Sequence, residues 1–166
     1  MERILVSSCL EGRRVRYDGA AKPVGADLFE RWRAEGRLVP FCPEVSGGLA
    51  VPRPPAEIVG GDGHAVLDGT ARVRTDAGDD VTTEFLRGAH LALDTARRSG
   101  ARIALLKESS PSCGSGRIYD GTFTGAPVPG AGVTTALLER AGIQVFNETD
   151  LATVDALLRT LETTGS

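Results

Sequence analysis

The stretch Arg3-Ile4-Leu5-Val6-Ser7-Ser8, followed at once by Cys9, decides the fold class. A short, continuous apolar run of this kind is typical of a strand that is buried on both faces of a parallel sheet. Similar runs occur at residues 37–41, 102–107 and 143–146. We therefore expect four strands in one mainly parallel sheet.

Amphipathic segments alternate with these strands. The clearest predicted helix begins after Asp79-Asp80, either of which can cap it, and ends at Gly100. Other helices are predicted around residues 28–36 and 133–142 and beyond Asp150. Alternating strands and helices indicate α/β architecture. We expect a single layered, Rossmann-like domain over residues 1–166, with a small hairpin insertion at residues 57–76.

Composition limits the classes of function. At 166 residues and 41% apolar content, the chain is long enough for one core. A net charge of −3 argues against a broad phosphate-binding surface, so charge does not support tRNA as a partner. Neither a signal-peptide pattern nor an apolar run of membrane-spanning length is present. We expect a cytoplasmic protein without a membrane partner; the oligomeric state is open.

The chain has three cysteines, and each lies just beyond the carboxyl end of a predicted strand. They are Cys9, Cys42 and Cys113. Because the carboxyl ends of parallel strands share one edge of the sheet, we expect the three thiols to meet there. An odd number of cysteines in a reducing compartment makes a disulfide framework a poor interpretation.

Three thiols at one edge fit several interpretations. Zinc normally takes a fourth protein ligand, and the two histidines, His64 and His90, are poorly placed to supply it. An iron–sulfur centre held by three cysteines would leave one iron open for a substrate. Unrelated thiols in loops are the third interpretation, and the spacing alone does not decide among them.

Longer motifs around the cysteines resemble the thiouracil desulfidase family, once classed as a domain of unknown function. The resemblance covers nearly the whole chain. The motifs that carry it are Ile4-Leu5-Val6-Ser7-Ser8-Cys9-Leu10, Arg16-Tyr17-Asp18-Gly19, Val39-Pro40-Phe41-Cys42-Pro43-Glu44-Val45-Ser46-Gly47-Gly48-Leu49, Pro52-Arg53-Pro54-Pro55-Ala56-Glu57-Ile58, Leu106-Lys107-Glu108-Ser109-Ser110-Pro111-Ser112-Cys113-Gly114, Ile118-Tyr119-Asp120-Gly121-Thr122-Phe123 and Gly130-Ala131-Gly132-Val133-Thr134.

The resemblance implies an enzyme that removes sulfur from a thiolated pyrimidine such as 4-thiouracil. It implies a [4Fe–4S] cluster on the three cysteines, with the remaining iron taking the substrate sulfur and water supplying the oxygen. It also implicates two catalytic residues, Glu44 in proton transfer and Ser110 in orienting water or substrate. The neighbouring serines, Ser109 and Ser112, are assigned to substrate binding.

Other interpretations stay open at this point. The cluster or the bare thiols could serve a redox or sensing protein, or the thiols could hold structural zinc. The substrate could be a free base, a nucleoside, a nucleotide or tRNA. Gly130-Ala131-Gly132 before a helix could bind a phosphate through backbone amides, or could simply form a turn. The sequence assigns no role to Arg53, Glu57 or Lys107.

Overall fold

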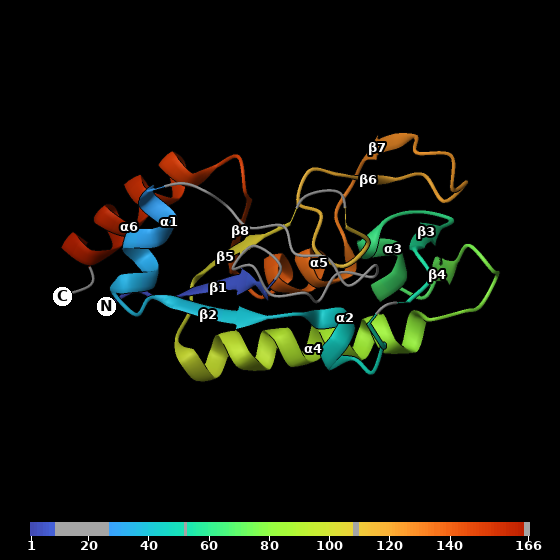
Figure 1. Ribbon diagram of the computed structural model, residues 1–166, viewed down its shortest axis with the longest axis horizontal. Coiled ribbons are helices and arrows are strands. Elements are labelled where there is room, and N and C mark those ends of the chain that lie inside the picture. The colour runs from blue at the N-terminus through green and yellow to red at the C-terminus, as the bar shows by residue number, and fades with distance from the viewer. Residues whose placement is uncertain (9–26, 52, 108–109, 165–166) are drawn as a thin grey trace.

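A four-stranded parallel sheet forms the centre of the molecule (Figure 1). The structure is a computed structural model that describes residues 1–8, 27–51, 53–107 and 110–164. The strands are β1 (Ile4–Ser7), β2 (Leu38–Phe41), β5 (Ile103–Leu106) and β8 (Gln144–Asn147), in the order β2-β1-β5-β8. The four predicted strands are confirmed to within one residue at each end, and every pairing is parallel.

Helices cover both faces of this sheet. On one face, α1 (Asp27–Ala34) and α6 (Leu151–Thr164) pack against alternate strand residues such as Ile4 and Val6. On the other face, α4 (Thr82–Ser99) and α5 (Val133–Arg140) pack against the intervening residues, such as Leu5. The predicted layered α/β fold is confirmed. No helix in the described ranges is long and apolar enough to cross a membrane.

The predicted boundaries of α4 agree with the local chemistry. The Asp80 carboxylate accepts a hydrogen bond from the backbone N–H of Thr82 at 2.9 Å, which satisfies one amide of the first turn. At the other end Gly100 has φ of +73°, a left-handed conformation that glycine adopts without steric cost.

The hairpin insertion is also present, with one addition. Strands β3 (Ala56–Val59) and β4 (Arg72–Thr75) pair antiparallel. A short helix, α3 (Gly63–Leu67), lies between them, and Asp62 caps it by accepting from Ala65 N. A third apolar cluster, with Ile58, Val73 and Phe85 among its members, joins this insertion to α4.

Two further elements differ from the sequence prediction. The glycines and prolines of residues 43–55 are typical of a loop, but Pro43–Ser46 form one helical turn, α2, directly after Cys42. Proline is favoured at the first position of a helix because its fixed φ suits a helix and its missing N–H is not needed there. A second antiparallel pair, β6 (Arg117–Tyr119) and β7 (Pro127–Pro129), was not predicted.

Candidate active site

The carboxyl edge of the parallel sheet gathers two of the three cysteines. Cys42 directly follows Phe41, which is paired with Ser7 at the end of β1. Cys113 lies in the loop after β5 and belongs to the same apolar cluster as Phe41. In this sheet the strand that follows β1 in the sequence is β2, which lies on one side of the β1–β5 pair. The strand that follows β5 is β8, which lies on the other side. Open α/β folds generally bind their ligands at such a reversal. Cys9 lies outside the described residues.

The Cys42 thiol is half-buried at the start of α2. Burial raises the pKa of this thiol above its ordinary value, and the carboxylate of Glu44 adds to the effect. The backbone N–H groups of Val45 and Glu44 and the positive charge of Arg53 oppose it. The thiol therefore keeps its proton near neutral pH, and metal binding at this sulfur must displace that proton.

The Cys113 loop is fastened to the amino end of α5. The amides of the first residues of α5 point at carbonyl oxygens on both sides of Cys113, which itself is buried. The amides of Gly132, Val133 and Thr134 donate to the carbonyls of Gly114, Pro111 and Ser112 respectively, each at 2.8 Å. These amides are therefore not available to a phosphate. The hypothesis that the segment Gly130-Ala131-Gly132 binds a phosphate through backbone amides at the start of this helix is wrong for the amides of Gly132, Val133 and Thr134.

Two glycines allow the cysteine loops to lie directly on helices. A Cβ at Gly132 would lie 2.4 Å from the carbonyl carbon of Ser112, and a Cβ at Gly88 would lie 1.9 Å from the carbonyl oxygen of Pro43. Neither glycine has a positive φ, so the requirement is one of space. Gly88 lies in α4 and Gly132 at the start of α5, and these helices pack on each other. The helix pair thus sets the positions of both loops.

A carboxylate and a hydroxyl join the two cysteine loops. Ser110 Oγ lies 3.4 Å from Glu44 Oε2 and donates to it. The other carboxylate oxygen of Glu44 accepts from Nε and Nη2 of Arg53, at 3.2 and 3.0 Å. Side chains of Glu44 and Arg53 are 18% and 7% exposed, so this ion pair is largely shielded from water. The two predicted catalytic residues are thus in contact.

The hydroxyl of Ser110 has a fixed direction. Its oxygen accepts from the backbone N–H of Ser112 at 3.1 Å and of Cys113 at 3.2 Å. Since a hydroxyl oxygen has two lone pairs, both are then used, and its proton is left to point at Glu44. Ser110 therefore connects the backbone of one cysteine to the carboxylate that follows the other.

Comparison with known proteins identifies the family. The family described as 2-thiouracil desulfurase matches residues 4–150. The chain belongs to this family. The resemblance seen in the motifs is confirmed.

Two relatives extend the comparison. A protein of Bacillus subtilis strain 168, described as the uncharacterized protein YbbK, is 47% identical over 148 residues, covering 89% of this chain and 97% of its own. A solved structure described as a [4Fe-4S]-dependent thiouracil desulfidase, TudS, is 51% identical. It has a TM-score of 0.88, covers 96% of this chain and is itself covered over 99% of its length.

The described residues of this desulfurase family member fit an iron–sulfur group in part. Two thiols, the preferred ligands of such groups, reach one sheet edge. Next to Cys113, the hydroxyl of Ser112 is fully buried and has no hydrogen-bond partner among the described residues. Leaving such a group unsatisfied costs about 1–3 kcal/mol. A sulfur atom of a bound group beside Cys113 would offer it an acceptor.

The ligand set is incomplete within the described ranges. There, no three His, Cys, Asp or Glu side chains come together as a metal site. Cys9, the predicted third ligand, lies outside these ranges. Ser109, a predicted substrate-binding residue, also lies outside the described residues.

Three residues that sequence reasoning left without a role have structural partners. Arg53 pairs with Glu44, as described above. The ammonium of Lys107, at the end of β5, lies 3.1 Å from Glu148 just beyond β8. Glu57 accepts from the backbone N–H of Gly121 and Phe123 and so holds the β6–β7 loop. Their presence in the family motifs was the one sequence signal for these contacts.

Proposed function

We propose that this protein is a [4Fe–4S]-dependent desulfidase that replaces the sulfur of a thiolated pyrimidine by oxygen from water and releases sulfide. One observation carries the proposal: Glu44, two residues after Cys42, contacts Ser110, whose oxygen binds the amide of Cys113. A proton-transfer pair thus lies between two predicted cluster ligands. The family and the description of the TudS structure support the same activity.

The proposed cluster ligands are Cys9, Cys42 and Cys113. When bound, the cluster supplies an open iron that takes the substrate sulfur as a Lewis acid. Three protein thiolates for four irons account for the open position. A cluster of this kind requires a reducing compartment, so we propose a cytoplasmic location.

Side chains of the protein carry out the proton transfers in this proposal. Glu44 takes a proton from the attacking water and returns one to a ring nitrogen or to the departing sulfide. Ser110 donates to Glu44 and restrains its second carboxylate oxygen. Oxygen replaces sulfur at the same oxidation level, so thiouracil and water give uracil and hydrogen sulfide without an electron donor. The substrate contacts predicted for Ser109 and Ser112 stay predictions.

The ring position of the sulfur belongs to the proposal. Our prediction from the sequence names 4-thiouracil, whereas the description of the family names 2-thiouracil. The test is therefore sulfide release by the anaerobically reconstituted protein, measured in parallel with both isomers as free base, nucleoside and nucleotide, and with thiolated tRNA. We expect sulfide and the corresponding oxygen compound (uracil from the base, uridine compounds from the others) from the 4-thio substrates, with one oxygen from ¹⁸O-labelled water in the product.

Two controls make this test decisive. Iron and sulfide analysis before the assay distinguishes an iron–sulfur protein from a zinc protein. Replacing Cys9, Cys42 or Cys113 by Ser, one at a time, is expected to lower iron content and abolish turnover. Protein that carries a full cluster and releases no sulfide from either isomer would contradict the desulfidase and favour a redox or sensing role. Sulfide release from 2-thiouracil and not from 4-thiouracil would show that the reaction takes place at C2 of the ring instead of C4.

A further inference from the structure

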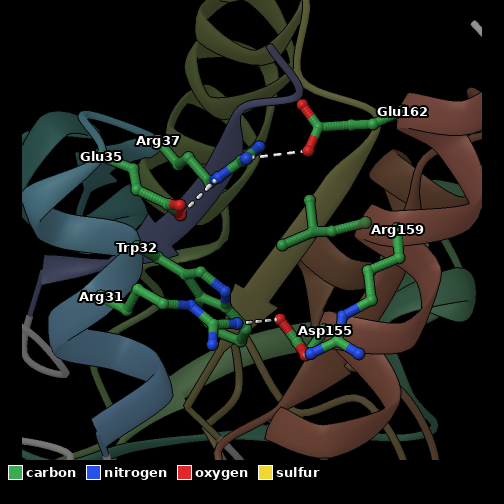
Figure 2. Close-up of a pocket in the computed structure, with 8 residues that line it drawn as sticks. Arg31, Trp32, Glu35, Arg37, Asp155, Arg159 and Glu162 are labelled. Carbon is green, nitrogen blue, oxygen red and sulfur yellow. Dashed lines mark hydrogen bonds and ion pairs between the residues drawn. The ribbon is translucent and has the colours of Figure 1, made fainter.

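A second polar cavity lies at the opposite edge of the parallel sheet. It has a volume of about 210 Å³ and opens between α1 and α6 (Figure 2). One of its lining residues, Arg37, immediately precedes β2, whereas Cys42 immediately follows that strand. The cavity is therefore at the amino edge, away from the cysteines, and the proposed desulfidase chemistry does not use it.

One side of the cavity carries net positive charge. The carboxylate of Asp155 on α6 is shared by two guanidinium groups. Its Oδ1 lies 2.5 Å from Arg31 Nη2, and its Oδ2 lies 2.8 Å from Arg159 Nη2. Two positive charges and one negative charge leave this group, which we call the basic side, with an excess of donors.

The other side carries net negative charge. Arg37 lies between two carboxylates: its Nε is 2.8 Å from Glu35 Oε1, and its Nη2 is 2.8 Å from Glu162 Oε1. A third donor of Arg37 is used by the carbonyl of Glu2. Among the lining residues this group, which we call the acidic side, has one positive and two negative charges. The positive amino group of Met1 also acts on Glu162, whose Oε2 accepts from the backbone N–H of Glu2 at 3.4 Å. In Figure 2 the acidic side lies above Trp32, and Arg31 of the basic side overlaps Trp32 in the view.

The indole of Trp32 supplies the second, independent observation. Trp32 is only 1% exposed, and its Nε1–H has no hydrogen-bond partner among the residues that the structure describes. In Figure 2 this nitrogen faces the gap between α1 and α6. A buried donor normally has an acceptor, and for Trp32 a water or a small molecule in the cavity is the acceptor to be expected.

We propose that this cavity binds a small zwitterion that carries a carboxylate and an ammonium group, the chemistry of an amino acid. The carboxylate accepts from Trp32 Nε1–H and from the guanidinium groups of the basic side. The ammonium group donates to Glu35 and Glu162 on the acidic side. A simple anion would meet the carboxylates, and a simple cation has no acceptor for the indole. Pockets for drug-sized ligands measure about 300–1,000 Å³, so this smaller cavity suits a molecule of few atoms.

The single tryptophan of the chain makes the proposal directly testable. Its indole N–H gives one cross-peak in a ¹H–¹⁵N spectrum of ¹⁵N-labelled protein. The probes are glycine, β-alanine and γ-aminobutyrate, in which the spacing of the two charges increases, with acetate and methylammonium as single-charge controls. We expect one of the zwitterions to shift the indole peak saturably, with little effect of acetate or methylammonium at the same concentration.

Variants separate this site from a structural effect. Glu162→Gln and Trp32→Phe are each expected to weaken binding about tenfold, the loss of one charge-assisted hydrogen bond, as measured by calorimetry. Arg33→Gln, on the same helix but outside the cavity lining, should bind as the wild type does. Trp32 is in the core, so a second variant is needed. If Trp32→Phe does not fold, the binding measured with Glu162→Gln tests the proposal.

Two results would overturn the proposal. One is an indole peak that none of the three zwitterions moves, since the N–H then serves water only. The other is a shift by acetate as large as that by the zwitterions, since the cavity is then an anion site. Sulfide release by Glu162→Gln is expected to equal that of the wild type, so failure here and failure of the proposed function are distinguishable.

Discussion

Glu44 is held at both oxygens, and each contact restricts it differently. Two nitrogens of the Arg53 guanidinium donate to one oxygen, Oε1, and fix its position. The second oxygen is left to Ser110. A base held in this way needs little rearrangement when a proton reaches it, which is the advantage of a preorganised site. Arg53 is thus the positioning residue for Glu44.

We predict that Glu44→Gln separates catalysis from cluster binding. The amide keeps the shape of the side chain but cannot take a proton. Turnover should therefore fall by about a hundredfold to ten-thousandfold, the usual contribution of a general acid–base group. Iron content should stay close to the wild-type value, because a carboxylate beyond Pro43 is not a predicted ligand. Paired iron quantification and sulfide-release kinetics provide the check.

Two results would contradict this role. Near-normal turnover of Glu44→Gln would remove the carboxylate from the reaction, and lost iron would make it a residue that supports the cluster. Arg53→Lys is the matched variant, since it keeps the charge but loses the two-nitrogen contact with Oε1. We expect an intermediate fall in turnover with unchanged iron content.

Among the elements, helices α4 and α5 determine where the cysteine loops lie. The sequence predicts that strand ends alone gather the cysteines, and the parallel register does bring the segments of Cys42 and Cys113 to one edge. The close approach at Gly88 and Gly132 could not be predicted, because a glycine inside or before a helix indicates only a weak helix or a turn. Its steric reason lies in a segment far away in the sequence.

We predict that Gly132→Ala moves the Cys113 loop. The new Cβ would lie 2.4 Å from the Ser112 carbonyl carbon, so the loop must shift. The expected cost is about 1–3 kcal/mol of folding free energy, together with clear loss of iron after anaerobic reconstitution. Val154→Ala, a core change between α6 and the sheet, is the control. It should lower the melting temperature without lowering iron content.

A second prediction at this scale concerns acid and the start of α4. The hydrogen bond from Arg72, and then those from Thr82, hold the pKa of Asp80 below its ordinary value. The ionised form is therefore favoured by folding, and its stabilisation is present above about pH 4 and lost at lower pH. We expect Asp80→Asn to cost less than about 1 kcal/mol at pH 7, because the pair is exposed.

The difference in the free energy of unfolding between wild type and Asp80→Asn should shrink as the pH falls from about 4 toward 2. Urea unfolding at a series of pH values measures it, with Asp79→Asn as the matched control on the neighbouring residue. If the difference in unfolding free energy between the two proteins grew on acidification, folding would not favour the ionised form of Asp80.

The fold could be predicted from the sequence where one pattern acts locally. Apolar runs gave the four parallel strands, and Asp80 and Gly100 gave the ends of α4. The single turn α2 was missed because the glycines and prolines after it dominate residues 43–55. The β6–β7 pair was missed because β7 begins and ends with proline, which is uncommon in strands.

At the scale of the whole molecule, the candidate active site shares its walls with the main core. Cys113 is 5% exposed and belongs to the cluster that includes Leu5, Leu106 and Leu138. Its loop is also bonded to α5 through backbone amides. Apolar burial and hydrogen bonds within the chain therefore build this part of the site.

We predict that removal of the metal leaves the protein folded. Chelation under reducing conditions should abolish sulfide release while the far-ultraviolet circular dichroism and a single cooperative thermal transition are kept. The melting temperature should fall by the amount that bound ligand contributes through linkage. Small zinc domains behave in the opposite way, since they unfold without metal. Loss of helical signal after chelation would show that the described core cannot stand alone.

The fastening of the Cys113 loop to α5 has a consequence for the lifetime of the enzyme. A centre with an open iron is damaged by oxidants sooner than a polypeptide is. If the polypeptide keeps its shape when the centre is lost, each molecule can be repaired by inserting a new centre, and no new protein has to be synthesised. The bonds between α5 and the loop would then let one chain serve through many rounds of oxidative damage.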